Sequence, residues 1–404
     1  MLERKVDVCV VGAGVAGIAC AQGLARQGAS VVLFERLDPM PNALKAEKID
    51  GEAVLALLRL GFQPAVEAAL TPLYNVSIYF GEQSLGMLRL RVPEAGGLYH
   101  VLINSLRAHL DPRIDFRRGT KVVGIEQRSD GVEVLTDSGE RVACRLVVMS
   151  TGDARQLLEP LGATYEPQMP EHVFVAAFTM EGSSGDPIAP ADTLTYHHPV
   201  PGGPVAYATV FRLGSSYRAN IFCPGPITEE WQRDLRQRPL EVMSRHNRLF
   251  AEVSKSWQVA SPVMIRKMQV FELRPPQLPR VVVLGDAAHT IDPSGGGGLT
   301  FSLLETEVLL NFHVARWLEI DDCGHEAIQA FYDDPRRTAA VRKFFGRGRH
   351  IYALNHDMSL KGTGRRLLFG LQTMLASRLG GRPTQAGHVT RTPWQLPAPY
   401  LYEE

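Results

Sequence analysis

The sequence of 404 residues lacks paired cysteines, long apolar runs and any excess of one charge. Its five cysteines are scattered with no CxxC pair, which argues against a zinc site and against a disulfide framework. No apolar run reaches the roughly 18 residues of a membrane span, and no signal-peptide pattern precedes the first expected strand. The 43 basic and 43 acidic residues cancel, so the whole chain has no electrostatic bias towards nucleic acid. We therefore expect a cytoplasmic protein that binds neither metal nor nucleic acid.

What is present is ordinary for a folded protein, with 45% hydrophobic and 21% charged residues. The chain is longer than one hydrophobic core usually supports, so we expect at least two lobes. The informative residues are glycines, which gather in two places.

The first glycine cluster, GAGVAG at residues 12–17, lies between a β-rich run at 6–11 and a helical segment that ends near Gln27. A second strand is expected at 30–34, and Glu35 follows it. In this setting Gly12 permits a tight turn, Gly14 permits the approach of a diphosphate, and Gly17 permits close contact between helix and sheet. Glu35 is expected to bind a ribose hydroxyl pair, so the unit predicts dinucleotide binding.

The second glycine cluster, residues 295–298, follows an apolar run, Gly285-Asp286 and Pro293. Glycines without Cβ atoms allow backbone N–H groups to approach a flat or anionic ligand at a helix start. A flexible linker is the alternative. The position between a strand and a helix disfavours it, because open α/β sheets place ligands there.

The strands between the two clusters predict two groupings. Runs at 114–116, 121–128, 131–136 and 141–148 indicate a β-meander inserted into the nucleotide-binding lobe. Runs at 74–80, 85–90, 173–181, 193–198, 205–213, 216–223 and 263–273 indicate an antiparallel sheet in a second lobe. Helices are expected at 99–110 and at 229–254, the latter broken at Pro239.

Basic residues dominate the C-terminal part, with twelve Lys or Arg against one acid, Asp357, between residues 335 and 391. Residues 367–379 add an amphipathic helix. Two interpretations stay open: a solvated face balanced by acids elsewhere, or a surface for a membrane or an anionic partner.

Taken together, the two glycine clusters and the sheet between them resemble the class A flavoprotein monooxygenases, which include p-hydroxybenzoate hydroxylase and the ubiquinone-pathway hydroxylases. The resemblance covers most of the chain and implies an α/β fold. Its FAD-binding domain would be Rossmann-like, of the glutathione-reductase type, with an inserted antiparallel-sheet substrate domain and C-terminal helices. The FAD-binding domain would be discontinuous and comprise residues 1–72, 98–165 and 274–334. The substrate-binding sheet domain would comprise residues 73–97 and 166–273, and the basic helical segment residues 335–404.

The resemblance also implies cofactor contacts. Glu35 would hold the adenosine ribose, Asp286 the ribityl chain, and glycines 295–298 the flavin pyrimidine and the diphosphate. From the polar loop at 42–48, Lys45 or Lys48 could face a phosphate or a flavin edge, with solvated lysines as the alternative. The full expected set is Gly12, Gly14, Val15, Ala16, Gly17, Glu35, Arg36, Lys45, Gly152, Asp286, Pro293, Gly296, Gly297, Gly298 and Leu299. His289 is expected to be structural.

Three departures from the family pattern stand out. Thr151 occupies the place of an aspartate in the family's Asp-Gly motif, where Asp153 is the available substitute. The helix that often begins with an FAD-contacting arginine begins with Tyr99 and His100, which leaves that contact unassigned. Thr300 and Glu305 replace the usual Asn and Asp.

The implied reaction is hydroxylation or epoxidation of an apolar aromatic or polycyclic metabolite. NADPH or NADH would reduce the flavin, and a flavin C4a-hydroperoxide formed with O₂ would transfer oxygen. A sheet-lobe His or Tyr could assist by deprotonating a phenolic substrate. The candidates are Tyr196, His197, His198, Tyr207, Arg212 and Tyr217, each of which is more typical of strand surface or core.

Two other functions stay open: an FAD-dependent C=C reductase of the geranylgeranyl-reductase type, and a non-catalytic flavin-binding partner protein. Halogenation is disfavoured because the Trp-x-Trp-x-Ile-Pro segment of the halogenases is absent. The expected partners are a small apolar aromatic substrate and O₂, for a monomer or homodimer that is cytoplasmic or, through the basic segment, membrane-associated.

Overall fold

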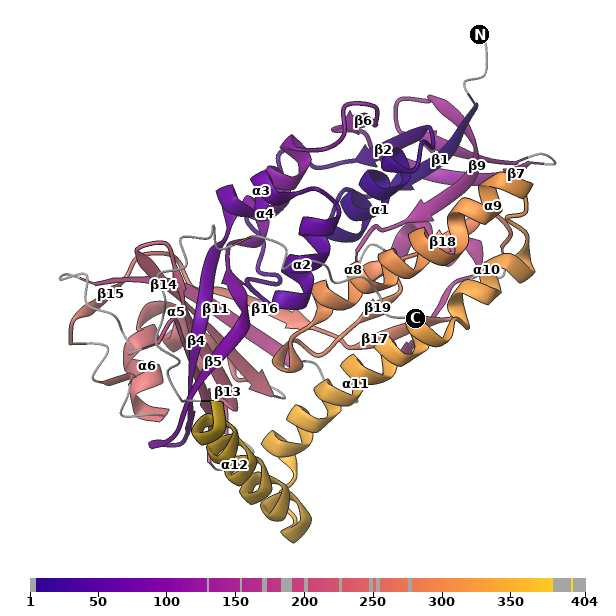
Figure 1. Cartoon of the computed structure of the whole chain (residues 1–404). Coiled ribbons are helices and arrows are strands. Elements are labelled where there is room, and N and C mark those ends of the chain that lie inside the picture. Colours follow the sequence, from indigo (N-terminus) through magenta and orange to yellow (C-terminus); the bar gives the residue numbers. More distant parts are fainter. Residues whose placement is uncertain are drawn as a thin grey trace.

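The computed structural model describes residues 5–128, 131–152, 155–168, 173–182, 191–199, 203–224, 227–246, 250–251, 255–274, 278–380 and Trp394. Two large sheets lie towards opposite ends of the molecule, and the second glycine cluster and its helix lie between them (Figure 1). The fold is α/β, as the sequence predicts.

The first sheet has seven strands in the order β6-β2-β1-β9-β8-β7, with β18 also paired to β9. The strands are β1 (Lys5–Val11), β2 (Val31–Glu35), β6 (Asp115–Arg118), β7 (Val122–Arg128), β8 (Gly131–Thr136), β9 (Arg141–Met149) and β18 (Val281–Val283). β6, β2, β1, β9 and β18 pair in parallel. Their carboxyl ends therefore meet at one edge, where this class of sheet binds ligands.

One part of the predicted meander is wrong. β7, β8 and β9 form it, but the run near residue 114 forms β6, which pairs in parallel with β2 at the edge of the sheet. The apolar residues of this run support either pairing, and the meander prediction followed chain order alone.

Helices cover the first sheet. α1 (Val15–Arg26) is buried along nearly its whole length, because the sheet lies on one side and α8 (Gly298–Leu309) on the other. The other helices of this lobe are α2 (Gly51–Arg59), α3 (Gln63–Ala69), α4 (Tyr99–Ala108), α9 (Ala315–Ile320) and α10 (His325–Tyr332). A π turn, Leu310–Val314, joins α8 to α9.

The second sheet has nine strands in the order β15-β11-β14-β13-β12-β4-β5-β3, with β16 also paired to β11. The strands are β3 (Lys48–Ile49), β4 (Thr71–Phe80), β5 (Gln83–Gly96), β11 (Val173–Gly182), β12 (Thr193–His197), β13 (Tyr207–Leu213), β14 (Ser216–Pro224), β15 (Trp257–Val259) and β16 (Met264–Met268). All pairs are antiparallel except β12 with β4. One face packs on α5 (Glu229–Gln237) and α6 (Pro239–His246), which end and begin beside Pro239 as predicted.

The single strand predicted at 263–273 is two strands. β16 belongs to the second sheet, whereas β17 (Phe271–Arg274) pairs with β10 (Thr164–Pro167) and β19 (His289–Thr290) in a separate three-stranded sheet. No glycine or proline stands between β16 and β17, so the sequence carries no signal for this crossing.

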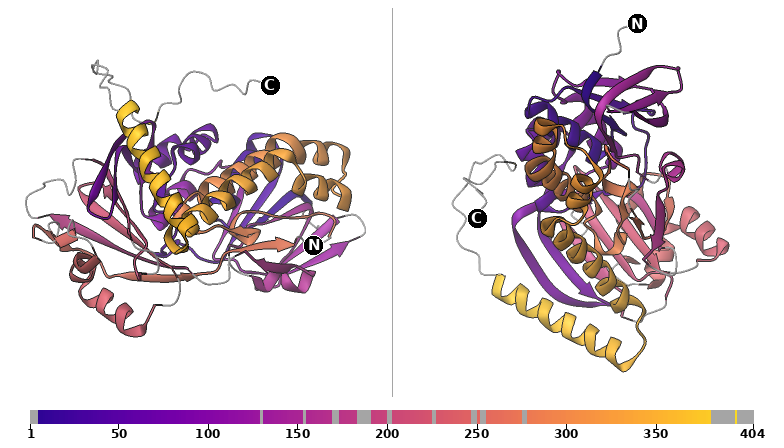
Figure 2. Two further views of the ribbon diagram at one scale, coloured as in Figure 1. Left: turned by 90° about the horizontal axis from the view of Figure 1, so that it is seen from below. Right: turned by 90° about the vertical axis from the view of Figure 1, so that its right-hand side faces the viewer.

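Two long helices complete the described chain. α11 (Pro335–His356) runs along the second glycine cluster, and α12 (Leu360–Gly380) lies at the outer edge of the molecule against β5 (Figure 2). Within the described residues, no helix is both long enough and apolar enough to cross a membrane.

Candidate functional site

A cavity of about 690 Å³ lies between the two sheets. All of the predicted cofactor-contacting residues except Gly17 line it, although they come from segments as distant as Gly12 and Leu299. The cavity also reaches the inner face of the second sheet, so one space joins the glycine loops to the second lobe.

Two helix N-termini open into this cavity without capping side chains. Gly14 is the N-cap of α1 and Gly297 that of α8, and neither provides a side-chain oxygen for the first backbone N–H groups. The Val15 backbone N–H at the start of α1 donates to the Tyr99 hydroxyl. The N–H groups of the first turn and the positive end of the helix dipole favour an anion at each start. A diphosphate would satisfy both requirements.

The glycines of both clusters serve packing as well as access. A Cβ on Gly17 would lie 1.8 Å from the Gly12 carbonyl oxygen, so Gly17 permits the close helix–sheet contact that the motif predicts. A Cβ on Gly297 would lie 2.4 Å from the Phe344 ring of α11. Gly298, in contrast, has open space where its Cβ would be, which leaves backbone exposed to the cavity.

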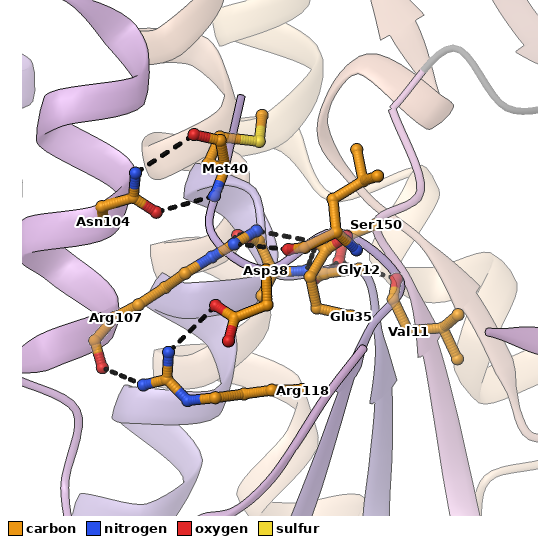
Figure 3. A network of polar contacts seen from close by, with 11 residues as sticks. Val11, Gly12, Glu35, Asp38, Met40, Asn104, Arg107, Arg118 and Ser150 are labelled. Atoms are coloured by element: carbon orange, nitrogen blue, oxygen red, sulfur yellow. Dashed lines mark hydrogen bonds and ion pairs between the residues drawn. The ribbon is translucent and has the colours of Figure 1, made fainter. Parts of the chain in front are cut away.

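Glu35, at the end of β2, is held by a network that the sequence did not reveal (Figure 3). Its Oε2 accepts from the Ala13 N–H at 2.8 Å and lies 2.9 Å from Arg107 Nη2. Arg107 also donates to the Ala13 carbonyl and to the Leu37 carbonyl. Burial lowers the pKa of Arg107, and the Glu35 carboxylate opposes that effect. One buried guanidinium therefore joins the glycine turn to the end of β2.

Helix α4, which carries Arg107, also fixes the loop after β2. Asn104 of α4 accepts from the Met40 N–H and donates to the Met40 carbonyl, at 2.8 and 3.1 Å. Arg118 reaches Asp38 at 3.1 Å. These contacts hold the loop that follows Arg36, and Arg36 lines the cavity.

Lys45 lies beside Asp286. Its Nζ is 3.4 Å from Asp286 Oδ2 and lies over the Tyr99 ring at 5.7 Å from the centroid. Tyr99 itself lines the cavity, where the family pattern has an arginine nearby. Lys45 therefore supplies a positive charge beside the start of α4, where this chain has Tyr99 and no arginine. Lys48, the other candidate, pairs with Glu94 at 2.5 Å.

The third strand end of the sheet also reaches the cavity. Ser150, after β9, donates to the Gly12 carbonyl at 2.8 Å, and Thr151 and Gly152 line the cavity. Gly152 has φ +67°, which favours glycine. Asp153, the substitute considered for the family's aspartate, lies outside the described residues.

Glu305 supports the Asp286 segment from behind. This fully buried carboxylate accepts from the Gly285 N–H at 2.9 Å and pairs with Arg337 of α11 at 2.8 Å. Burial raises the pKa of Glu305, while Arg337 opposes the rise. Arg337 also contacts His289 Nε2 at 2.5 Å, and burial together with Arg337 lowers the pKa of His289. His289 does not line the cavity, in keeping with the structural role expected for it.

The second sheet contributes a row of cross-strand neighbours. Arg266, Val175, Phe222 and Tyr207 stand opposite one another on β16, β11, β14 and β13, and all four line the cavity. The neighbouring positions add Thr209, Asn220 and Met268. The result is a mainly apolar wall with one guanidinium, and Arg266 donates to the Leu44 carbonyl at 3.1 Å.

Glu47 forms a polar corner of this wall. Arg218 donates to both Glu47 carboxylate oxygens at 2.8 Å, and the Asn220 amide nitrogen donates to Oε2 at 2.9 Å. Burial raises the pKa of Glu47, and Arg218 opposes this. Breaking such a buried pair would be costly, so the corner is rigid.

Only Tyr207 among the proposed catalytic residues lines the cavity. His197 lies behind it, with ring centroids 4.8 Å apart. The others are elsewhere: Tyr196 donates to the His246 carbonyl, His198 lies beside Tyr196 and His246, Arg212 pairs with Asp192, and Tyr217 packs on Trp257. Burial raises the pKa of Tyr207, so its phenol stays protonated at neutral pH.

Parallel strands, two helix starts without a capping N-cap side chain and a largely buried carboxylate at the end of β2 define an α/β dinucleotide-binding protein with a second, sheet-based lobe. The chain belongs to the FAD binding domain family, whose model matches residues 5–310. It is an FAD-dependent oxidoreductase. The residues present fit FAD, because the cavity combines diphosphate-binding helix starts with a carboxylate for ribose. No metal-binding cluster of His, Cys, Asp or Glu occurs among the described residues.

Known proteins with similar sequences include hydroxylases and reductases. The 3-demethoxyubiquinol 3-hydroxylase of Escherichia coli is 23% identical over 77% of this chain and 80% of its own. Digeranylgeranylglycerophospholipid reductase 1 of Methanopyrus kandleri is 26% identical over 88% of this chain and 92% of its own. Among solved structures, p-nitrophenol 4-monooxygenase from Pseudomonas putida superimposes with a TM-score of 0.70 at 19% identity, covering 94% of this chain and all of the other. The last likeness confirms the fold.

Proposed function

We propose that this protein is an FAD-dependent monooxygenase that hydroxylates or epoxidises an apolar aromatic or polycyclic metabolite, with NADPH or NADH as reductant and O₂ as cosubstrate. The observation that supports it best is that one continuous cavity joins the glycine loops to an apolar wall of the second sheet. When bound, FAD supplies the transfer of electrons from the nicotinamide and the activation of O₂. The relatives named as hydroxylases and monooxygenases support this reaction over others.

Each part of the cavity has its own task in this proposal. Glu35, held by Arg107, binds the adenosine ribose, and the starts of α1 and α8 bind the diphosphate with Lys45 as a further positive charge. Asp286 accepts from the ribityl chain. The apolar wall excludes water from the reacting centre.

The substrate end favours a flat apolar ring with one polar substituent. Val175, Phe222 and Met268 offer apolar contact, while the Tyr207 phenol can donate a hydrogen bond and Arg266 can attract a phenolate or a carbonyl oxygen. Tyr207 acts as a donor that orients substrate, because a phenol with a raised pKa is a poor proton acceptor.

The test uses the FAD-loaded protein, a panel of aromatic metabolites and ¹⁸O₂. We expect nicotinamide oxidation stimulated by a hydroxylated bicyclic or larger ring, and a product that carries one labelled oxygen atom. An unlabelled product would overturn the proposal. Tight coupling on a small charged benzoate would contradict the proposed substrate class.

A C=C reductase of the geranylgeranyl-reductase type is the second candidate, because the archaeal reductase matches nearly its whole length. It predicts saturation of an isoprenoid chain by the reduced protein under anaerobic conditions and no need for O₂. A non-catalytic flavin-binding protein would bind FAD without any ligand-stimulated oxidation of NADPH or NADH.

We retain the proposed division of the chain into FAD-binding segments (1–72, 98–165, 274–334), substrate-binding segments (73–97, 166–273) and a basic C-terminal segment (335–404). The composition of the two sheets supports it, with β3 as a short strand that crosses from the first part to the second. A monomer or homodimer in the cytoplasm, in contact with a membrane through the C-terminal segment, completes the proposal.

A further inference from the structure

Helix α12 presents its leucines to solvent. Leu360, Leu367, Leu371 and Leu375 are spaced by seven, four and four residues and are 93, 72, 51 and 49% exposed. This spacing puts them on one helix face, and Leu368, 54% exposed, widens it. We call these five residues the leucine row.

The opposite face of α12 packs against the protein with few large side chains. Phe369 contacts His197 at 5.0 Å between ring centroids, and Thr373 is buried. An amphipathic helix normally buries its apolar side. In α12 the broader apolar side points outwards, as its place at the edge of the molecule in Figure 2 allows, so the leucine row requires an occupant.

The charges around the leucine row indicate what the occupant is. Residues 358–380 contain four Lys or Arg and no Asp or Glu. Lys361 is exposed at the edge of the row, directly after Leu360 and about two turns before Leu368. Arg365 pairs with Asp357 at 3.3 Å, and Arg366 donates to the Leu354 and Asp357 carbonyls. A leucine face with an exposed lysine at its edge and no acid in the helix is the pattern of a helix that lies in the interface of an anionic bilayer.

Other occupants fit less well. A second copy of α12 would bring two acid-free basic helices together, and like charges oppose that contact. Of the residues after α12, the structure describes Trp394, which is buried in the core formed around α1 and α8, away from the leucine row. Much of the positive charge on α11 is already neutralised, since Arg337 pairs with Glu305, Lys343 with Glu52 and Arg347 with Asp50.

The leucine row lies close to the substrate end of the cavity. On the inner side of α12, Phe369 touches His197, and the His197 ring lies 4.8 Å from that of Tyr207, which lines the cavity. One side-chain layer therefore separates the helix from the cavity wall.

We propose that α12 docks the enzyme on an anionic lipid bilayer through the leucine row, and that the enzyme takes a substrate dissolved in that bilayer. The second clause rests on the proposed monooxygenase function. The first depends only on α12. Upon docking, the leucines enter the boundary between headgroups and acyl chains, and Lys361 contacts lipid phosphates.

The test is flotation of the full-length, FAD-loaded protein with vesicles. Phosphatidylcholine vesicles containing about one-third phosphatidylglycerol should bind the protein, pure phosphatidylcholine should bind it more weakly, and added salt should release it. Leu367→Ser/Leu371→Ser should weaken binding by at least about tenfold, since two apolar side chains are lost. The matched control is Ile320→Ser on α9, which removes an equally exposed apolar residue, 55%, from another surface and should bind as the wild type does.

Three results would overturn docking: no binding of the wild type to anionic vesicles, equal binding of the leucine variant, or an α12-dependent dimer in the absence of vesicles that the leucine variant abolishes. Flavin absorbance of each variant verifies that it is folded. Failure of the proposed function is seen separately, because NAD(P)H oxidation with a water-soluble phenol requires no vesicle. Vesicle binding without any ¹⁸O transfer would sink the monooxygenase and leave docking intact.

Discussion

Arg107 of α4 and Glu35 of β2 form an ion pair, 2.9 Å between Nη2 and Oε2, at the place where the cavity meets the first glycine cluster. The side chains of both are largely buried, at 1 and 11% exposure. Arg107 also donates to the Ala13 carbonyl, while the Ala13 N–H donates to Glu35. The carboxylate proposed to bind ribose is thus fixed before any ligand arrives, which lowers the entropic cost of binding.

Replacing Arg107 tests this arrangement. Arg107→Met should weaken FAD binding at least about tenfold and destabilise the protein by roughly 3 kcal/mol, because the Glu35 charge is left without its partner. Arg107→Lys should behave much like Arg107→Met, since a single ammonium nitrogen cannot reproduce the planar guanidinium that reaches Glu35 and the Ala13 and Leu37 carbonyls at once. Fluorescence titration with FAD and urea unfolding measure the two effects. Arg113→Met, at an exposed pair with Asp111, is the control, and a loss of the same size in that variant would reject a specific role for Arg107.

Asp286 is the second residue whose loss should release the cofactor. Asp286→Ala is expected to be purified with little FAD, because it removes the carboxylate that faces the cavity and leaves Lys45 without its 3.4 Å partner. Absorbance of the purified variant gives the flavin content per chain. Asp322→Ala, on the exposed turn after α9, should keep its FAD. If Asp286→Ala retained the full amount, the assignment of the ribityl site would be refuted.

Glu305 and Arg337 are predicted to act as a unit. Either Glu305→Gln or Arg337→Met alone should cost about 3 to 5 kcal/mol of stability, because each leaves an uncompensated charge in the core. The double variant should lose clearly less than the sum of the two, so that a double-mutant cycle gives a coupling energy. Additive losses would show that the pair is not coupled. The single variants should also bind FAD more weakly, because the Glu305 side chain that accepts from the Gly285 N–H then loses either its charge or the Arg337 that holds it in place.

The cofactor end of the cavity was predictable from sequence because its residues belong to two compact glycine motifs with fixed spacing. Arg107 carried a signal too: it follows Tyr99, Leu102, Ile103 and Leu106 at helical spacing, on the buried face of α4, where an arginine is unusual. Arg337 carried none, since its partner Glu305 is thirty-two positions away and on another helix.

The substrate end was not predictable, because strand register decides it. β12 is buried on both faces, so no alternation of polar and apolar residues shows which of Tyr196 and His197 faces the cavity side. A shift of one residue exchanges the two faces. Tyr207 was named among several equivalent candidates, and only its pairing with Phe222 and His197 distinguishes it from them.

Acid should destabilise the protein through His197. Burial between Tyr207 and Phe369 lowers the pKa of His197 to about 4, against about 6.5 in an unfolded chain. The unfolded state therefore binds the proton first as the pH falls. The contribution of the neutral ring to stability is complete above about pH 6.5 and is lost progressively down to about pH 4. Between pH 7 and pH 5 this one residue should cost about 2 kcal/mol. His289, whose pKa is also lowered by burial, adds to the loss.

His197→Phe keeps a ring against Tyr207 and Phe369 but cannot bind a proton. Urea unfolding at pH 7 and pH 5 should therefore show a difference in the free energy of unfolding that is smaller by about 2 kcal/mol than in the wild type. His325→Gln, an exposed histidine on α10, should leave the difference unchanged. If His197→Phe lost as much stability on acidification as the wild type, proton uptake at His197 would not explain the acid sensitivity.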